Sequence, residues 1–356
     1  MSTDISMTTA ELLRQRLELV YRWYQGMVSA DTGMLEYLYL PETDTFVRER
    51  SSIRDIASVW DAALVGAFLK RDDLRVMIER SVAHYAGYLT ARNGQLILEP
   101  RRLHEPSSIA HSAFMILALL HAAPPRHTSE ILALADGIRR QQRPDGSYKV
   151  YFHDLPDSGE ELYAGEAMLA LMETFRELDE EQCLQSAERA FGYYDAHYFR
   201  RGLVTDDVLV FFANWQSQAC RLLFEHARTP ALSHAIADYL YRMHDRIIEN
   251  GFFDAVERHP AQQVSVAVAC ALEGLNDAYA VARASHDSRV ETYRQRICTG
   301  LAYLLALQCV GNAPDRARGG FGLERDDQTQ RIDVTGHAAS AFMKSIENDI
   351  ACARAA

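Results

Sequence analysis

Two kinds of helix-like segment alternate along this chain of 356 residues. Alternate segments, beginning with the first, keep their charges on one side, which is typical of helices with one solvent face. The segments between them, such as IAHSAFMILALL and VSVAVACALEGL, are apolar and alanine-rich nearly all round, so we expect other helices to enclose them. Apolar periodicity predicts about twelve such helices, at approximately residues 8–28, 53–69, 73–91, 107–122, 127–142, 159–177, 180–197, 210–226, 231–249, 262–284, 288–308 and 333–350.

The connections between these helices alternate in the same phase. Links from an inner helix to the next outer helix are brief, whereas links from an outer to an inner helix are long. The long links of such hairpins all emerge on one face, and long loops on a rigid scaffold are where binding and catalysis tend to reside. The long links span roughly residues 29–52, 92–106, 143–158, 198–209, 250–261 and 309–332.

Inner helices begin about every fifty residues, which indicates a repeated supersecondary unit. An open solenoid would need polar capping faces, but the first and last inner helices are as apolar as the others. No convincing run of alternating strands is visible. The sequence therefore predicts an all-α protein in which residues 1–356 form a single (α/α)6 toroid, with its functional face at the N-terminal ends of the inner helices.

Charge and hydropathy exclude some classes of partner. The formal net charge of -12 argues against nucleic acid and anionic lipid, because binding to either depends on clustered Lys and Arg. The N-terminal residues lack the pattern of a secretory signal, and the most apolar window, residues 113–120, is too short for a membrane span. We therefore expect a cytoplasmic protein that binds a small molecule, and the sequence makes no prediction of oligomeric state.

The six cysteines are spread singly, and we expect them to be reduced thiols that act as small core hydrophobes. No cysteine stands beside a histidine at an inner-helix start, which argues against a Cys-ligated metal and leaves only carboxylates and histidines as metal ligands. The motifs GxxxxGK[ST], GxGxxG and HExxH are absent as well. We expect no cofactor and no metal. The cysteines are Cys183, Cys220, Cys270, Cys298, Cys309 and Cys352.

Three long links carry a turn signal followed by aromatic residues: RPDGSYKVYF at 143–152, NGFFD at 250–254 and RGGFGLE at 318–324. One interpretation makes them short hairpins that line the mouth of the ring. The other makes them hydrophobic plugs that tie the loops to the ring, and the sequence does not decide between the two.

The segments QQRPDGSY with ELYAGEAMLAL, and GGFGLERDDQTQRIDVTGHAASAF near the end, carry a resemblance at the level of a superfamily. In these segments and in its hairpin architecture, the chain resembles the six-hairpin glycosidase and sugar-epimerase toroids. The resemblance to terpene-cyclase and protein-prenyltransferase toroids is looser, because the chain has no DxDD run and no Cys–His zinc pattern. The resemblance to the glycosidase and sugar-epimerase toroids implies a carbohydrate-active enzyme, a hydrolase or an isomerase, and leaves the substrate open.

Several acids lie at or near the starts of inner helices, where the resemblance to glycosidases implies a pair of opposed carboxyl groups. The predicted pair is Glu161 or Glu166 opposite Asp333 or Asp55. An acid in a first helical turn also serves simply as a cap. Glu166 differs, because it lies a full turn inside an apolar helix, where an unpaired carboxylate would be costly and an ion pair with Arg54 or Arg331 would explain it structurally.

Two further hypotheses stay open. The resemblance to sugar epimerases implies that His111 and His337 face each other and transfer a proton next to a carbonyl, although a lone histidine on an inner helix is also typical of a hydrogen-bonded core residue. A non-catalytic or biosynthetic accessory toroid would instead bind a peptide or a small hydrophobic molecule in an apolar funnel. For a sugar, the predicted binding residues are Arg54, Glu105, Tyr148, Tyr151, Tyr163, Trp215, Gln216, Gln263, Phe321 and Arg331.

Overall fold

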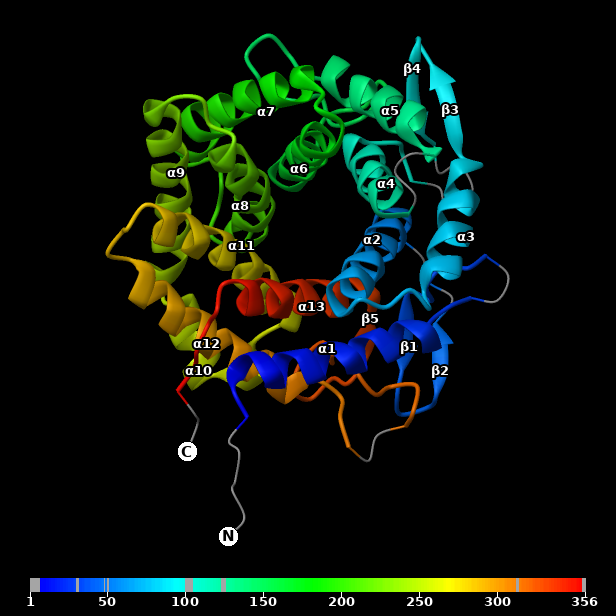
Figure 1. Ribbon diagram of the computed structural model, residues 1–356, viewed down its shortest axis with the longest axis vertical. Coiled ribbons are helices and arrows are strands. Elements are labelled where there is room, and N and C mark those ends of the chain that lie inside the picture. The colour runs from blue at the N-terminus through cyan, green and yellow to red at the C-terminus, as the bar shows by residue number, and fades with distance from the viewer. Residues whose placement is uncertain are drawn as a thin grey trace.

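A ring of inner helices stands within a ring of outer helices, as the view down the ring axis shows (Figure 1). The structure is a computed structural model that describes residues 7–29, 32–47, 49, 51–99, 105–122, 126–311 and 314–353. The inner helices are α2 (Ser52–Leu69), α4 (Ile109–Ala122), α6 (Glu160–Leu178), α8 (Leu209–Glu225), α11 (Ser265–Ala284) and α13 (Ile332–Glu347). The outer helices are α1 (Thr9–Gly26), α3 (Arg75–Ala86), α5 (Thr128–Arg140), α7 (Glu181–Tyr193), α9 (Pro230–Glu249) and α12 (Val290–Leu307).

The ring closes where α13 packs between α11 and α2 and against α1. This closure confirms the toroid and excludes the open solenoid. Close approach between inner helices depends on small residues at their contacts. A Cβ atom at Gly165 of α6, for example, would stand 2.6 Å from the Cβ atom of Trp215 on α8. Glycine at this position therefore lets α8 bring its tryptophan against the next inner helix.

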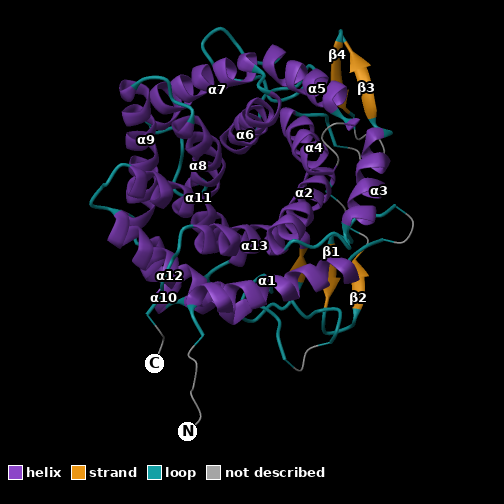
Figure 2. Ribbon diagram, viewed as in Figure 1, coloured by secondary structure: helices purple, strands orange, loops and turns teal. Residues whose placement is uncertain are grey.

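The short elements of the links are where the sequence prediction was wrong. A three-stranded antiparallel sheet joins β1 (Leu38–Leu40) to β2 (Thr45–Val47) and to β5 (Gln330–Arg331), as Figure 2 shows in orange. The pairing of Leu38 with Arg331 brings the first and last long links side by side. Strands of two to four residues are too short for an alternating pattern to be visible in the sequence.

A second hairpin pairs β3 (Leu89–Arg92) with β4 (Gln95–Leu98), so the predicted helix 73–91 ends too late. Its turn consists of Asn93 and Gly94, both with positive φ, at 50° and 73°. Asn-Gly between apolar residues is a strong hairpin signal, and the sequence analysis missed it.

The three aromatic links do not form hairpins around the mouth of the ring. They form isolated bridges only: Gln142 pairs with Tyr148 and Ser108 with Tyr151 in the first, and Gln308 pairs with Phe321 and Gly322 with Gln330 in the third. Tyr148 and Phe321 are fully buried, which favours the plug interpretation for both. The NGFFD segment instead starts a short helix, α10 (Phe252–Arg258). A π-helical turn, Tyr194–Phe199, extends α7, and a 3-10 turn spans Pro260–Gln262.

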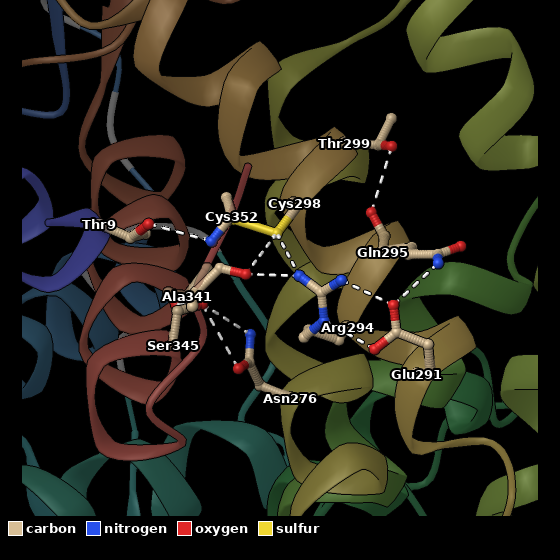
Figure 3. The surroundings of a disulfide bond; sticks show 11 residues. Thr9, Asn276, Glu291, Arg294, Gln295, Cys298, Thr299, Ala341, Ser345 and Cys352 are labelled. Carbon is tan, nitrogen blue, oxygen red and sulfur yellow. Dashed lines mark hydrogen bonds and ion pairs between the residues drawn. A yellow bond between two sulfur atoms is a disulfide. The ribbon is translucent and has the colours of Figure 1, made fainter. Parts of the chain in front are cut away.

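One pair of cysteines departs from the expected reduced state, because Cys298 of α12 and Cys352 form a disulfide (Figure 3). The backbone N–H of Cys352 donates to Thr9 Oγ1 at 3.0 Å, and the guanidinium of Arg294 donates to the carbonyl of Ala351. The segment after α13 is thus fastened to both α12 and α1. The other four cysteines are free thiols, three of them buried. No helix of the described residues is long and apolar enough to cross a membrane.

Candidate active site

A cavity of about 330 Å³ opens among the N-terminal halves of the inner helices. Residues from α2, α4, α6, α8, α11 and α13 all reach it, so the cavity is on the ring axis at the end where the long links enter. Its lining combines aromatic rings, four carboxyl groups, two arginines, a histidine and a cysteine. The lining residues are Ile53, Arg54, Ala57, Trp60, Asp61, Phe114, Leu162, Tyr163, Glu166, Phe211, Trp215, Val266, Cys270, Glu273, Arg331, Asp333 and His337.

Asp333, in the first turn of α13, is held by two arginines. Arg331 Nε donates to Asp333 Oδ1 at 2.6 Å, and Arg54 Nε donates to Asp333 Oδ2 at 2.9 Å. Burial of the carboxyl opposes ionisation, but the two arginines outweigh it and hold the pKa of Asp333 below its usual range. Asp333 is therefore a buried carboxylate that stays ionised at neutral pH, and the side chain of Arg54 remains 46% exposed at the mouth.

Glu166, on α6, is in the opposite electrostatic state. Its side chain is only 5% exposed, and its Oε2 atom has no hydrogen-bond partner among the described residues. Burial raises the pKa of Glu166 to about 8, against the smaller lowering effects of His337 and Arg54. The ion pair that would have explained Glu166 structurally is not formed, because Arg54 and Arg331 both bind Asp333. Glu166 is thus a protonated acid facing the cavity at neutral pH.

Asp61, on α2, is a second carboxyl group with a raised pKa. Burial, with Glu273 and Asp333 adding to it, raises the pKa of Asp61 to about 8, although His337 lowers it. Its carboxyl packs directly against Gly336 of α13, where a side-chain Cβ would collide with it. A glycine at position 336 therefore makes room for this carboxyl between α2 and α13.

His337, one turn after Asp333 on α13, is bound to Glu273 of α11. The distance from His337 Nδ1 to Glu273 Oε2 is 2.6 Å, and Asn214 Nδ2 donates to the same carboxylate oxygen at 3.0 Å. Burial disfavours a charged imidazole, but the adjacent Cys270 and Glu273 outweigh it and raise the pKa of His337 well above its ordinary value. The edge of the Trp215 ring also packs on this imidazole, with the ring centroids 5.6 Å apart.

Seven of the residues predicted from the sequence lie together in this cavity. They are Glu166, Asp333, His337, Arg54, Tyr163, Trp215 and Arg331. Four predicted residues lie elsewhere, in contacts with the outer layer or within the links. Asp55 accepts from the Tyr85 hydroxyl of α3 at 3.4 Å, and Tyr148 lies 3.3 Å from Ser186 Oγ. The side chain of Gln216 accepts from Tyr239 of α9, and the carbonyl of Gln263 accepts from Tyr303 of α12.

The remaining predicted residues also lie outside the cavity lining. His111 is buried, with Nε2 at 2.8 Å from Ser52 Oγ and Nδ1 at 2.8 Å from Ser108 Oγ. Glu105 accepts from the Ser52 hydroxyl in the same cluster between α2 and α4, so His111 fits the core-histidine interpretation. The pair of His111 and His337 is not brought together at the cavity. Glu161, Phe321 and Tyr151 do not line it either, and the Tyr151 hydroxyl is bound to Ser158.

Three cavity residues with reactive side chains, Asp61, Cys270 and Glu273, were not among the predicted site residues. Glu273 had a usable signal, because it is a carboxylate inside the apolar run VSVAVACALEGL, the same feature that singled out Glu166. Cys270 had none, since a buried cysteine in an inner helix is the ordinary case.

The fold has close counterparts among solved structures, although comparison with family models and with curated protein sequences gives no match. The chain is similar to a D-mannose isomerase, with a TM-score of 0.69, 10% identity, and coverage of 94% of this chain and 97% of that one. It is also similar to a cellobiose 2-epimerase from Bacillus thermoamylovorans, with a TM-score of 0.66, 12% identity, and coverage of 95% of this chain and 98% of that one. An unsaturated glucuronyl hydrolase from Bacillus sp. GL1 has a TM-score of 0.66 and 13% identity, with coverage of 95% of this chain and 97% of that one. Across nearly the whole chain, the protein therefore has the (α/α)6 toroid fold of these enzymes.

Proposed function

We propose that this protein is a carbohydrate-active enzyme that binds a sugar or oligosaccharide in the cavity at the N-terminal ends of the inner helices. The observation that carries the proposal is the pair of Glu166 and Asp333. One carboxyl is protonated and the other ionised at neutral pH, and α6 and α13 lie on opposite sides of the ring (Figure 1). Two carboxyl groups with separated pKa values are the arrangement that general acid and base catalysis of glycoside cleavage requires.

In this proposal Glu166 is the general acid. Its protonated carboxyl, with Oε2 free of protein partners among the described residues, donates a proton to the glycosidic oxygen as the bond breaks. Asp333 stays ionised because two arginines hold it, so it serves as the base that activates water or as the carboxylate that stabilises positive charge on the sugar. Tyr163 and Trp215 supply aromatic faces for the sugar ring.

Sugar isomerisation is the second candidate, and the contact between His337 and Glu273 favours it. A carboxylate bound to imidazole Nδ1 fixes the ring and its tautomer, as in other proton-transferring histidines. Because His111 lies outside the cavity, His337 would have to move the proton alone, which suits transfer between adjacent carbons on one face of the sugar. Arg54 would stabilise the enolate. The accessory-toroid hypothesis receives less support, because ionisable carboxyls line the cavity on both sides.

A pooled thermal-shift screen of sugars, sugar acids and prenyl compounds tests the proposal. A ligand that binds the native state raises the apparent stability by RT ln(1 + [L]/Kd), so we expect a sugar to raise Tm. The stabilising sugar is then incubated with the protein in deuterated water. Hydrolysis leaves carbon-bound hydrogens in place, whereas isomerisation exchanges one with solvent. Stabilisation by prenyl compounds alone would contradict both sugar reactions.

A further inference from the structure

Three side chains with different donor atoms meet at the inner wall of the cavity. Cys270 and Glu273 are three residues apart and therefore share a face of α11, and His337 reaches the same point from α13. One ligand atom from each, a sulfur, a carboxylate oxygen and an imidazole nitrogen, lies within 4.8 Å of the other two. All three residues also line the cavity, so a species bound between them would be accessible to a ligand there.

We propose that Cys270, Glu273 and His337 bind a zinc ion whose fourth coordination position faces the cavity. Thiolate, imidazole and carboxylate are the ligands that Zn²⁺ takes in proteins, and three protein ligands with one open position are typical of catalytic rather than structural zinc. A thiolate ligand disfavours Mg²⁺ and Ca²⁺, which prefer oxygen.

The charge of the cavity supports a cation at this place. Both arginines of the lining are bound to Asp333, so the other three carboxyl groups of the lining, those of Asp61, Glu166 and Glu273, have no arginine partner there. Glu166 is more than nine-tenths buried, and its Oε2 atom has no hydrogen-bond partner in the described part of the chain. Asp61 and Glu166 stay neutral, so the charges that would offset a divalent cation are those of two of its own ligands, the Glu273 carboxylate and the Cys270 thiolate.

The surroundings also orient the ligands. Asn214 Nδ2 donates to Glu273 Oε2 at 3.0 Å, the kind of outer contact that fixes a metal-binding carboxylate. His337 Nδ1 and Glu273 Oε2 are now 2.6 Å apart, a separation that fits a shared proton. Tetrahedral zinc with bonds of about 2.0–2.1 Å would hold these atoms about 3.3 Å apart, so the ion replaces the proton with a shift of less than ~1 Å.

In the sequence no cysteine stands beside a histidine at an inner-helix start, which argued against a Cys-ligated metal. The fold removes that argument, since α11 and α13 are neighbours in the ring. The proposed ion goes beyond the proposed function, whose acid and base require no metal. A bound zinc would polarise a carbonyl or hydroxyl oxygen of the ligand in the same cavity.

Metal binding by the purified full-length protein tests the proposal without any substrate. The protein is stripped with a chelator and equilibrated with Zn²⁺ in a metal buffer, and bound zinc is measured by atomic spectrometry. We expect one zinc per chain and no binding of Mg²⁺ in a parallel sample. In a second experiment with Co²⁺ alone, a thiolate ligand gives a sulfur-to-cobalt charge-transfer band in the near ultraviolet.

Cys270→Ser should abolish this band and weaken zinc binding by at least about tenfold. The matched control is Cys220→Ser, a buried cysteine of α8 outside the cavity, which should keep both. His337→Asn and Glu273→Gln, checked for folding by circular dichroism, should weaken zinc binding while the cobalt band stays visible at higher Co²⁺. A wild-type protein that binds no zinc, or a band that persists in Cys270→Ser, overturns the proposal. Either result leaves Glu166 and Asp333 untouched, and sugar turnover is tested separately.

Discussion

The two ends of the toroid are built from the same helices but differ in how their buried acidic side chains are paired. A second cavity, of about 380 Å³, lies among the C-terminal halves of the inner helices, and Trp60 lines both cavities. At this far end Arg176 Nη2 lies 2.5 Å from Glu173 Oε2, an ion pair without hydrogen-bond geometry. Asp277 pairs with Arg221 at 3.3 Å and with Lys344 at 2.6 Å.

Burial raises the pKa of Glu173 to about 7 despite Arg176, whereas Glu166 at the N-terminal end has no ion-pair partner among the described residues and a pKa raised to about 8. Glu166 and Glu173 are seven residues apart on α6, two helical turns, so they lie on the same face at opposite ends of the ring. Both acids therefore have a raised pKa, but of the two it is Glu173 that has an arginine beside it, and an unpaired acid kept protonated in a cavity is typical of a functional site. The two carboxyls therefore form a matched pair for experiment.

The largest expected effect separates these two glutamates. Glu166→Gln removes the proposed general acid and should lower the turnover of the sugar found in the screen by about 10²–10⁴-fold, whereas Glu173→Gln should leave turnover close to the wild-type value. Initial rates at saturating sugar measure both. Similar losses in the two variants would mean that the ends of the ring do not differ in function.

The disulfide fastens the chain that leaves the far end of α13, so its loss should affect stability and not the N-terminal cavity. Cys298 and Cys352 are 54 residues apart, and loop-closure entropy for such a loop predicts that Cys352→Ser lowers the free energy of unfolding by about 4 kcal/mol. Urea denaturation under non-reducing conditions measures this, with Cys309→Ser as the control. Equal stability of wild type and Cys352→Ser would show that this disulfide does not stabilise the folded chain.

A third test compares Asp277 and Asp333, two buried aspartates at opposite ends of the ring that each bind two cationic side chains. Asp277→Asn leaves Arg221 and Lys344 without their shared carboxylate in a buried site, which should cost about 3 kcal/mol of stability without reducing turnover. Asp333→Asn should cost less stability, because Arg54 is 46% exposed and remains solvated, but it should strongly reduce turnover. Urea unfolding measures the loss of stability in both variants, and initial rates measure the loss of turnover. The reverse pattern would assign the functional carboxylate to the far end.

The last test is a pH dependence. The pKa of Glu166 rises from 4.5 to about 8 on folding, so between these values the folded chain keeps a proton that the unfolded chain has released. Stability therefore falls as pH rises through this range, by up to about 1.4 kcal/mol per pH unit, and levels off above pH 8. Glu166→Gln should lack this component, which urea unfolding of both proteins at several pH values measures. Parallel curves would mean that Glu166 is ionised in the folded state.

Sequence patterns located the long helices well, because each inner helix is apolar all round and each outer helix is not. They failed at the short elements. The strand at Gln330–Arg331 is two residues long and exists only because the link around Leu38 pairs with it. The Asn93-Gly94 turn could have been predicted, since its signal is local.

For the candidate site, the sequence pointed to Glu166, Asp333 and His337, which the structure places in one cavity, because a polar residue near the start of an apolar helix stands out. It could not separate Asp333, which faces the axis, from Asp55, which faces Tyr85 of α3. Both are acids in a first turn, and only the rotation of each helix about its own axis decides which way they point.

The sequence by itself therefore determined the alternation of helices, their closure into a ring and the face at which polar groups gather, since these follow from which surfaces must avoid water. Tertiary structure alone decided the partners of each charge. Both arginines bind Asp333, so Glu166 has neither as a partner and stays protonated. The packing of α11 against α13 brings Cys270 and His337 together from distant positions in the chain. Electrostatic and metal-binding properties depend on distances of a few ångströms between neighbouring helices, and no pattern along a single helix contains them.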